Sequence, residues 1–204
     1  MTSKQVKNYL EKSAYSPIRP ELEYALGLSK GGAVAIDCGC GAGSNIAHLR
    51  ARGFSVHAFD IDEQAIAMCA DRFADDSNVI LSVDSFGSFS YPTASIVVAD
   101  ASLFFCPVNE LKLFVEKIVQ SLQPQGVFYG AFLGARDTMA SSHFNTDAYW
   151  GEVMVLSAEN IKNTLSGFDI VQFKEHESDG VTTTGDDHHW HILSVVANIS
   201  SKVL

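Results

Sequence analysis

The hydrophobic positions of this chain alternate between two spacings, and this alternation predicts strands and helices in turn along the sequence. Short, nearly continuous apolar runs predict strands over residues 33–37, 56–59, 79–83, 95–99 and 127–133. Apolar residues at helical spacing predict helices over residues 21–28, 44–52, 63–73, 108–122 and 157–165. Two further apolar runs predict strands over residues 168–175 and 191–198. Strands that alternate with helices are typical of an α/β fold built around a parallel sheet.

The first predicted strand runs into a glycine-rich turn, Asp37-Cys38-Gly39-Cys40-Gly41-Ala42-Gly43. Glycine permits positive φ angles and close approach of a ligand, so a strand, a glycine turn and a helix are what a nucleotide-type cofactor needs. A dinucleotide-binding turn has the spacing G-x-G-x-x-G, and here the third glycine, Gly43, comes too early. The carboxylate of Asp37 suits a ligand with a cationic amino group better than a pyrophosphate. An ordinary tight connection between a strand and a helix is the alternative interpretation.

Acidic residues follow the next predicted strands, at the same edge of the sheet as the glycine turn. Asp60 is placed to accept hydrogen bonds from both hydroxyls of an adenosine ribose, with helix capping as its alternative role. We assign the capping role to Asp62 instead. Asp84 is a candidate acceptor for an adenine amino group. Phe86 would either cover a ring face or pack in the core.

Composition and charge narrow the class of protein. A chain of 204 residues predicts one domain, and a formal net charge of −10 disfavours nucleic acid and anionic membranes as partners. The polar N-terminal segment predicts no signal peptide, and no apolar run is long enough to cross a bilayer. Two of the four cysteines lie inside the glycine turn, too close together to form a disulfide with each other, which favours reduced thiols and a cytoplasmic protein. Because no second Cys pair follows Cys38 and Cys40, we expect no metal site.

These motifs resemble those of the class I S-adenosylmethionine-dependent methyltransferases. The resemblance covers residues 33–132 and includes the turn Leu122-Gln123-Pro124-Gln125-Gly126, in which Gln125 replaces the first glycine of the family's L-x-P-G-G. Cys40 and Asn45 are similar to the small bacterial tellurite-resistance type. The resemblance implies a single Rossmann-like, doubly wound sheet of seven strands, mostly parallel with the last strand antiparallel. It also implies S-adenosylmethionine as cofactor, S-adenosylhomocysteine as product, and a small-molecule methyl acceptor as partner.

The strand ends and the resemblance together give a set of expected cofactor-binding residues. They are Asp37, Cys38, Gly39, Cys40, Gly41, Asn45, Asp60, Ile61, Asp84, Ser85, Phe86, Asp100 and Ala101.

Residues 134–156 have the composition of a long loop and are expected to form a lid. We expect Tyr15 and Arg19 from the N-terminal lead, and Tyr149 and Trp150 from the lid, to form the acceptor pocket. The alternative is that the aromatic residues of the loop anchor it to the core. The single methyltransferase domain of residues 1–204 then divides into a lead (1–30), a cofactor-binding core (31–133), the lid (134–156), and a C-terminal helix and hairpin (157–204).

An acceptor that is already anionic, such as a thiolate or a metalloid oxyanion, needs no strong base. Because no single residue stands out as a base, we assign none. If the acceptor must lose a proton, the candidate bases are Asp100, His143, Tyr149, His188, His189 and His191. The run from Asp186 to His191 fits a hairpin end better than a metal site. Two other functions stay open: a non-catalytic S-adenosylmethionine-binding regulatory module, and a nicotinamide-dependent dehydrogenase, which the glycine spacing disfavours.

Overall fold

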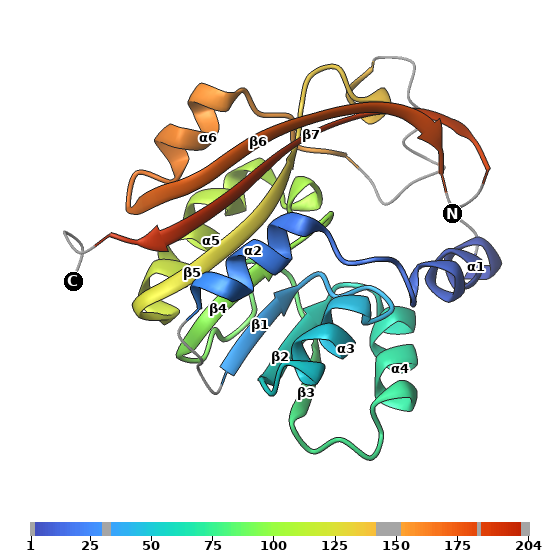
Figure 1. Cartoon of the computed structure of the whole chain (residues 1–204). Helices are drawn as coiled ribbons and strands as arrows, with labels where there is room; N and C mark the ends of the chain where they lie inside the picture. Colours follow the sequence, from blue (N-terminus) through green and yellow to red (C-terminus); the bar gives the residue numbers. More distant parts are fainter. Residues whose placement is uncertain (1–2, 30–33, 142–151, 183–184, 201–204) are drawn as a thin grey trace.

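Seven strands form one sheet in the order β3-β2-β1-β4-β5-β7-β6 (Figure 1). The computed structural model describes residues 3–29, 34–141, 152–182 and 185–200. The strands are β1 (Val34–Cys38), β2 (Ser55–Asp60), β3 (Val79–Val83), β4 (Ala94–Ala99), β5 (Leu122–Leu133), β6 (Phe168–Val181) and β7 (Asp187–Ile199). The helices are α1 (Ser3–Ser13), α2 (Pro20–Leu28), α3 (Ser44–Ala51), α4 (Glu63–Arg72), α5 (Val108–Ser121) and α6 (Ala158–Thr164), with short 3-10 helices η1 (Leu103–Phe105) and η2 (Thr138–Ala140).

The strand directions confirm the expected doubly wound sheet. Neighbouring strands from β3 to β5 run parallel, and β7 runs antiparallel to both β5 and β6. Within the described part of the chain, β7 is therefore the one strand of opposite direction. The carboxyl ends of β1, β2, β3 and β4 meet at one edge, so the glycine turn and the strand-end acids come together there.

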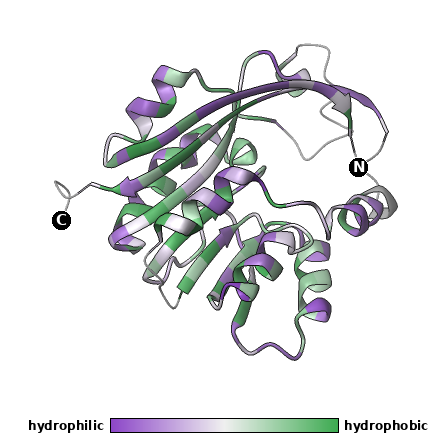
Figure 2. Cartoon of the chain, viewed as in Figure 1, coloured by the Kyte–Doolittle hydropathy of each residue, from purple (hydrophilic) through white to green (hydrophobic). Residues whose placement is uncertain are grey.

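Helices cover both faces of the sheet because successive strand residues point to opposite faces. On one face, α5 and α6 pack on strand residues that include Val97 and Phe128. On the other face, α2, α3 and α4 pack on residues that include Val98 and Tyr129. All six residues of the central strand β4 are buried. Apolar residues are concentrated in the inner strands of the sheet (Figure 2). No helix in the described ranges is long and apolar enough to cross a bilayer.

The hairpin of β6 and β7 is longer than the hydrophobic pattern predicted. The two strands pair from Phe168 and Ile199 as far as Val181 and Asp187, so residues 178–181 of the polar segment belong to β6. Since β5 ends where Leu133 pairs with Ile192, the rest of the hairpin extends beyond the carboxyl edge of the sheet, toward the side where α1 lies (Figure 1). Most β6 side chains there are exposed, so the segment shows no apolar alternation from which a strand could be predicted.

The start of β5 also differs from the sequence prediction. β5 begins at Leu122 rather than at residue 127, with a register shift against β4. The turn expected over residues 123–126 is this irregular first part of the strand. Gln125 has a φ angle of 67°, in the left-handed region that favours glycine. This conformation explains why related sequences have glycine where this chain has Gln125.

Candidate cofactor site and active site

The glycine turn between β1 and α3 adopts a backbone conformation that requires glycine. Gly39, Gly41 and Gly43 have φ angles of 69°, 51° and 80°. A Cβ atom on Gly39 would lie 2.5 Å from the Cβ of Ser102, so the turn packs directly against the segment after β4. The hydroxyl of Ser102 donates a hydrogen bond of 2.5 Å to the carbonyl of Cys38. The turn is thus fixed against the end of β4.

Asp60, at the end of β2, holds the glycine turn from the other side. Its Oδ2 accepts a hydrogen bond of 2.9 Å from the backbone N–H of Gly41, and its Oδ1 accepts one of 3.0 Å from the backbone N–H of Asp62. Burial raises the pKa of Asp60, and the two backbone donors act in the opposite direction. Asp62 accepts from the N–H of Gln64 at 2.7 Å and caps α4, as predicted. Asp60 therefore stands at the edge with a fixed carboxylate.

Asp37, at the end of β1, is a buried acid that forms no ion pair with the described residues. Its side chain is 1% exposed, and neither carboxylate oxygen accepts a well-formed hydrogen bond from the described residues. Burial, together with the charges of Asp100 and Asp60, raises its pKa to about 7, although the side chain of Asn45 lowers it. A buried carboxylate of this kind is stable in its ionised form only beside a cation.

Asp100, after β4, is by contrast a partnered acid. Its Oδ1 lies 3.0 Å from Nε of Arg19 and accepts a hydrogen bond of 3.0 Å from the hydroxyl of Tyr129 on β5. Burial raises the pKa of Asp100, while Arg19 and Tyr129 lower it. The next residue, Ala101, has a φ angle of 50° and forms the sharp exit from the strand. Arg19 from the N-terminal lead thus reaches the edge of the sheet, and its place in an acceptor pocket stays a prediction.

Of the residues that follow β3, Asp84 and Ser85 lie at the edge of the sheet and Phe86 lies in the core. Asp84 accepts a hydrogen bond of 2.8 Å from the hydroxyl of Ser88, and Ser85 contacts the same hydroxyl. Phe86 is 8% exposed, with its ring packed edge-on against Phe59 and Phe114 in the core. This position favours the core role for Phe86.

Helix α1 covers the glycine turn, which the sequence analysis did not anticipate. Its apolar residues pack against Ala42 of the turn and Ala65 of α4. Burial and the nearby charge of Asp60 raise the pKa of Tyr9 on this helix. The amphipathic spacing of Val6, Tyr9 and Leu10 was the sequence feature from which a packed helix could have been predicted.

Tyr15 follows this helix and contacts α4. It is 83% exposed, and the guanidinium of Arg72 lies 4.9 Å from its ring centroid. Arg72 also donates to the carbonyls of Ala14 and Ala42, at 2.9 Å and 2.8 Å. Arg72 therefore joins the end of α1 to the glycine turn, and Tyr15 belongs to that contact. Ile61 is 72% exposed beside Asp60, which leaves an apolar side chain free at the edge.

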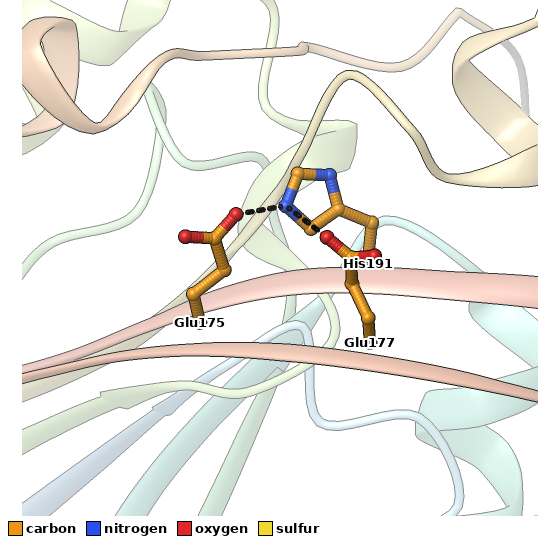
Figure 3. A group of neighbouring side chains, drawn as sticks. All are labelled: Glu175, Glu177 and His191. Carbon is orange, nitrogen blue, oxygen red and sulfur yellow. Dashed lines mark hydrogen bonds and ion pairs between the residues drawn. The ribbon is translucent and has the colours of Figure 1, made fainter.

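A group of possible metal ligands lies on the overhanging hairpin (Figure 3). Glu175, Glu177 and His191 each offer a ligand atom, and these atoms lie within 4.8 Å of one another. His191 Nε2 is 2.8 Å from a Glu175 oxygen and 3.8 Å from a Glu177 oxygen. The guanidinium of Arg136 forms ion pairs with both carboxylates. The sequence did not indicate this group, because its members are not neighbours in the chain.

The hydrogen bonds of His191 argue against metal ligation there. The backbone N–H of Arg136 donates to His191 Nδ1 at 3.0 Å, so Nδ1 is the unprotonated nitrogen. In neutral imidazole the other nitrogen, Nε2, then carries the proton and donates it to Glu175. A metal on Nε2 would move the proton to Nδ1, where it would face the N–H of Arg136. The group is therefore an ion-pair network centred on Arg136.

The expected lid, residues 134–156, is described at its two ends, and both ends are anchored. Asp137 and Met139 are 2% and 7% exposed. At the other end, the N–H of Met154 donates to the carbonyl of Phe104 at 2.7 Å, and Val155 bridges to Leu133. His143, Tyr149 and Trp150 lie outside the described residues.

Four buried cysteines occupy the site and its surroundings as free thiols. Burial raises the pKa of Cys38 well above its ordinary value, so this thiol is protonated at neutral pH. The thiol of Cys69 donates to the carbonyl of Gly41 at 3.2 Å, so the glycine turn is also held from α4. Cys38 and Cys40 contribute to the turn through their backbone and their small size.

Comparison with known proteins agrees with this geometry. Residues 35–126 match a family described as "Methyltransferase domain". The mitochondrial arginine-hydroxylase NDUFAF5 of Rattus norvegicus is 35% identical over 107 residues, which are 52% of this chain and 30% of that protein. The chain thus spans less than a third of the length of this curated relative.

Two solved structures have the same fold over nearly the whole chain. TehB from Haemophilus influenzae has a TM-score of 0.73 at 13% identity and covers 96% of this chain and 67% of its own. Magnesium protoporphyrin IX methyltransferase from Synechocystis PCC 6803 was solved with bound S-adenosylmethionine. It has a TM-score of 0.69 at 12% identity, and the match covers 97% of this chain and 92% of that methyltransferase. S-adenosylmethionine is the cofactor of this class. Residues 35–126 therefore resemble a methyltransferase domain, and the chain has the fold of these solved S-adenosylmethionine-dependent methyltransferases.

Proposed function

We propose that this protein is an S-adenosylmethionine-dependent methyltransferase that transfers a methyl group directly to a small-molecule acceptor. The observation that carries the proposal is the buried, unpartnered carboxylate of Asp37 beside the glycine turn. An isolated buried charge is costly, and the amino group of the cofactor supplies the cation that this site lacks. A pyrophosphate would instead place like charge against Asp37.

The other edge residues fit the remaining parts of the cofactor. Asp60, held by two backbone N–H groups, keeps lone pairs for the ribose hydroxyls. Asp84 and Ser85 stand at the next strand end for the adenine, and exposed Ile61 offers an apolar contact. The cofactor supplies an activated methyl group on a sulfonium. The protein aligns the acceptor with that methyl group and excludes water.

A small acceptor agrees with the charge of the protein. The net charge of −10 disfavours nucleic acid as the acceptor, because its phosphates would be repelled. The acceptor pocket would be formed between the lead (1–30) and the segment 134–156, within a single domain of residues 1–204. The four buried free thiols fit a reducing compartment such as the cytoplasm.

Two measurements test the proposal. S-adenosylmethionine, and not NAD, should raise the melting temperature, because a ligand that binds only the folded state stabilises it. A panel of thiols, selenite, tellurite, amines, phenols, carboxylates and free arginine should then reveal an acceptor that yields S-adenosylhomocysteine. Arginine is included because the matched relative is named for its hydroxylation; mass spectrometry distinguishes an added methyl group from an added hydroxyl.

A variant pair links the result to the site. Asp37→Asn should abolish the stabilisation by S-adenosylmethionine, and Asp169→Asn on the exposed edge strand β6 is the matched control. Cofactor binding without turnover on any acceptor would favour the regulatory module instead. If S-adenosylmethionine raised the melting temperatures of Asp37→Asn and the parent equally, Asp37 would not bind the cofactor. The proposal would then lose the observation on which it rests.

A further inference from the structure

A buried His–Asp pair lies at the start of β7, apart from the cofactor-binding residues. His188 Nε2 is 2.9 Å from Oδ1 of Asp137, and their side chains are 1% and 0% exposed. Asp137 precedes η2, in the segment that follows β5, so the pair joins the overhanging hairpin to the end of the parallel sheet. Nothing in the cofactor site uses either residue.

The hydrogen bonds of Asp137 determine which nitrogen of His188 carries the proton. The carboxylate accepts from the backbone N–H of Met139 at 2.9 Å and from the backbone N–H of His191 at 2.8 Å. With both backbone donors satisfied, Asp137 is an acceptor toward His188, and Nε2 is the donor. The lone pair of His188 is therefore on Nδ1. That buried nitrogen has no hydrogen-bond partner among the described residues.

The other histidines of the same run differ in this respect. His191 Nδ1 accepts from Arg136, and its Nε2 contacts Glu175. His189 Nδ1 lies 2.7 Å from Asp179, and its Nε2 lies 3.8 Å from Glu177. Within the described part of the chain, His188 is thus the member of the run with a lone pair that nothing engages. An imidazole held by a carboxylate on one nitrogen and free on the other is the arrangement of a general base.

We propose that the Asp137–His188 pair is the general base of the methyl transfer, and that the acceptor is therefore a hydroxyl or an amine that must lose a proton. This inference rests on the proposed function. The acceptor oxygen or nitrogen forms a bond to the methyl carbon while the carbon–sulfur bond breaks, and that electron pair remains on sulfur. The acceptor proton passes to Nδ1 of His188, and the imidazolium so formed is paired with Asp137 until water takes the proton.

The half-buried ring of Trp190 covers the imidazole. The two ring centroids are 3.8 Å apart, with the planes tilted by 32°. The side chain of His188 is itself 1% exposed, so bulk water does not reach the imidazole. A base that is dry until the acceptor arrives is protected from protonation by bulk water.

Other charged groups on the neighbouring strand face elsewhere. β6 places Gly180 opposite His188, while its acids Glu177 and Asp179 lie opposite His191 and His189, on the other face of the hairpin. On the same face as His188, but further along β6, Lys174 and His176 contact the buried Glu21 of α2. Among the described residues, Asp137 is therefore the charged partner that determines the state of His188.

The experiment compares three variants with the parent, using catechol, tyramine and thiophenol as acceptors. His188→Gln and Asp137→Asn should lower kcat for catechol or tyramine by roughly 100-fold or more at neutral pH, with unchanged affinity for S-adenosylmethionine by calorimetry. The parent's rate should fall toward low pH, because the base must be unprotonated to accept the proton. This fall should vanish in His188→Gln, which lacks the imidazole. Methyl transfer to thiophenol, which ionises by itself, should change little. His189→Gln is the matched control. It disrupts a second His–Asp pair of the same hairpin, His189 with the exposed Asp179, and it should retain the parent's rate.

Each contrary result has a distinct meaning. If Asp137→Asn does not fold, His188→Gln alone decides, and added imidazole should restore part of the rate of His188→Ala. The assignment of the base would be wrong if His188→Gln methylated hydroxyl or amine acceptors at the parent's rate. It would also be wrong if the parent methylated thiophenol alone. Either result would leave the proposed function intact. Absence of S-adenosylhomocysteine with every acceptor of the wider panel would instead contradict the proposed function.

Discussion

The backbone N–H of Gly41 donates to the carboxylate of Asp60 at 2.9 Å, so the acid that ends β2 also fixes the turn that follows β1. Asp60 ends β2 and Gly41 follows β1, and these two strands are parallel neighbours, so the bond joins their carboxyl ends. Any ligand that contacts Asp60 is therefore held beside the backbone of the glycine turn. This coupling gives Asp60 a structural role beside the binding role that we propose for it.

Replacing Asp60 with alanine should weaken S-adenosylmethionine binding strongly. The variant loses an ionised acceptor for the ribose hydroxyls, which costs on the order of 2–4 kcal/mol in binding free energy. It also leaves the N–H groups of Gly41 and Asp62 without their acceptor, so the melting temperature should fall by a few degrees. Calorimetry and thermal unfolding measure the two effects. Unchanged affinity in the folded variant would show that Asp60 is not part of the site.

Replacing Asp37 with asparagine should stabilise the free protein at neutral and higher pH. In the folded state the pKa of Asp37 is about 7, above its ordinary value of 3.8. Between those two pH values the folded state binds more protons than the unfolded state, so the free energy of unfolding falls as pH rises from about 4 to about 7. By linkage the loss is on the order of 4 kcal/mol. Urea unfolding should show Asp37→Asn more stable than the parent at pH 8, with a smaller difference at pH 5.

The same carboxyl makes cofactor binding depend on pH in the opposite direction. A cationic ligand binds the ionised form of Asp37, so binding should release a proton below about pH 7, and affinity should rise from pH 6 to pH 8. Calorimetry in buffers of different ionisation enthalpy counts that proton. Proton uptake on binding would contradict the assignment of the amino group to Asp37.

Replacing Gln125 with glycine should stabilise the protein by about 1 kcal/mol, because a residue with a side chain is strained at a φ angle of 67°. Gln123 provides a matched control two residues earlier. Its φ angle is not positive, so Gln123→Gly should destabilise the protein by roughly 0.5–1 kcal/mol through chain entropy. Chemical unfolding of both variants measures the difference, and a loss of stability in Gln125→Gly would contradict the strain.

The ion-pair network on the hairpin should not hold a metal ion. We expect nitrogen-15 NMR to find His191 protonated on Nε2, and zinc titration of the parent to show no stoichiometric, tight binding at this group. Arg136→Ala removes the guanidinium but keeps the backbone N–H that occupies Nδ1, so it should not create a tight site. One equivalent of tightly bound zinc, lost in His191→Gln, would overturn this prediction.

Much of the fold could be predicted because its features are local in the sequence. The glycine turn, the strand-end acids and the cap at Asp62 each follow from a short run of residues, and parallel strands bring their carboxyl ends together. The remaining features depend on contacts between distant residues. The group of Glu175, Glu177 and His191 requires the pairing of β6 with β7, and the polar outer hairpin has no hydrophobic pattern from which that pairing could be predicted.

The candidate site shows the same division. The sequence placed Asp37 and Asp60 at the edge, but it could not show that one is unpartnered and the other fixed by two N–H groups. Nor could it separate His188 from His189 and His191, because the three differ in their partners and not in their spacing. Phe86 was left open between cofactor and core, and its packing on Phe59 and Phe114 favours the core.

The order of the strands has a consequence for synthesis on the ribosome. β7 lies between β5 and β6, so β6 emerges before the strand that attaches it to the sheet. Until residues 187–199 have been translated, the edge of β5 is unpaired and β6 has no place in the sheet. The nascent chain therefore exposes an aggregation-prone strand edge, and sheet completion waits for the last strand.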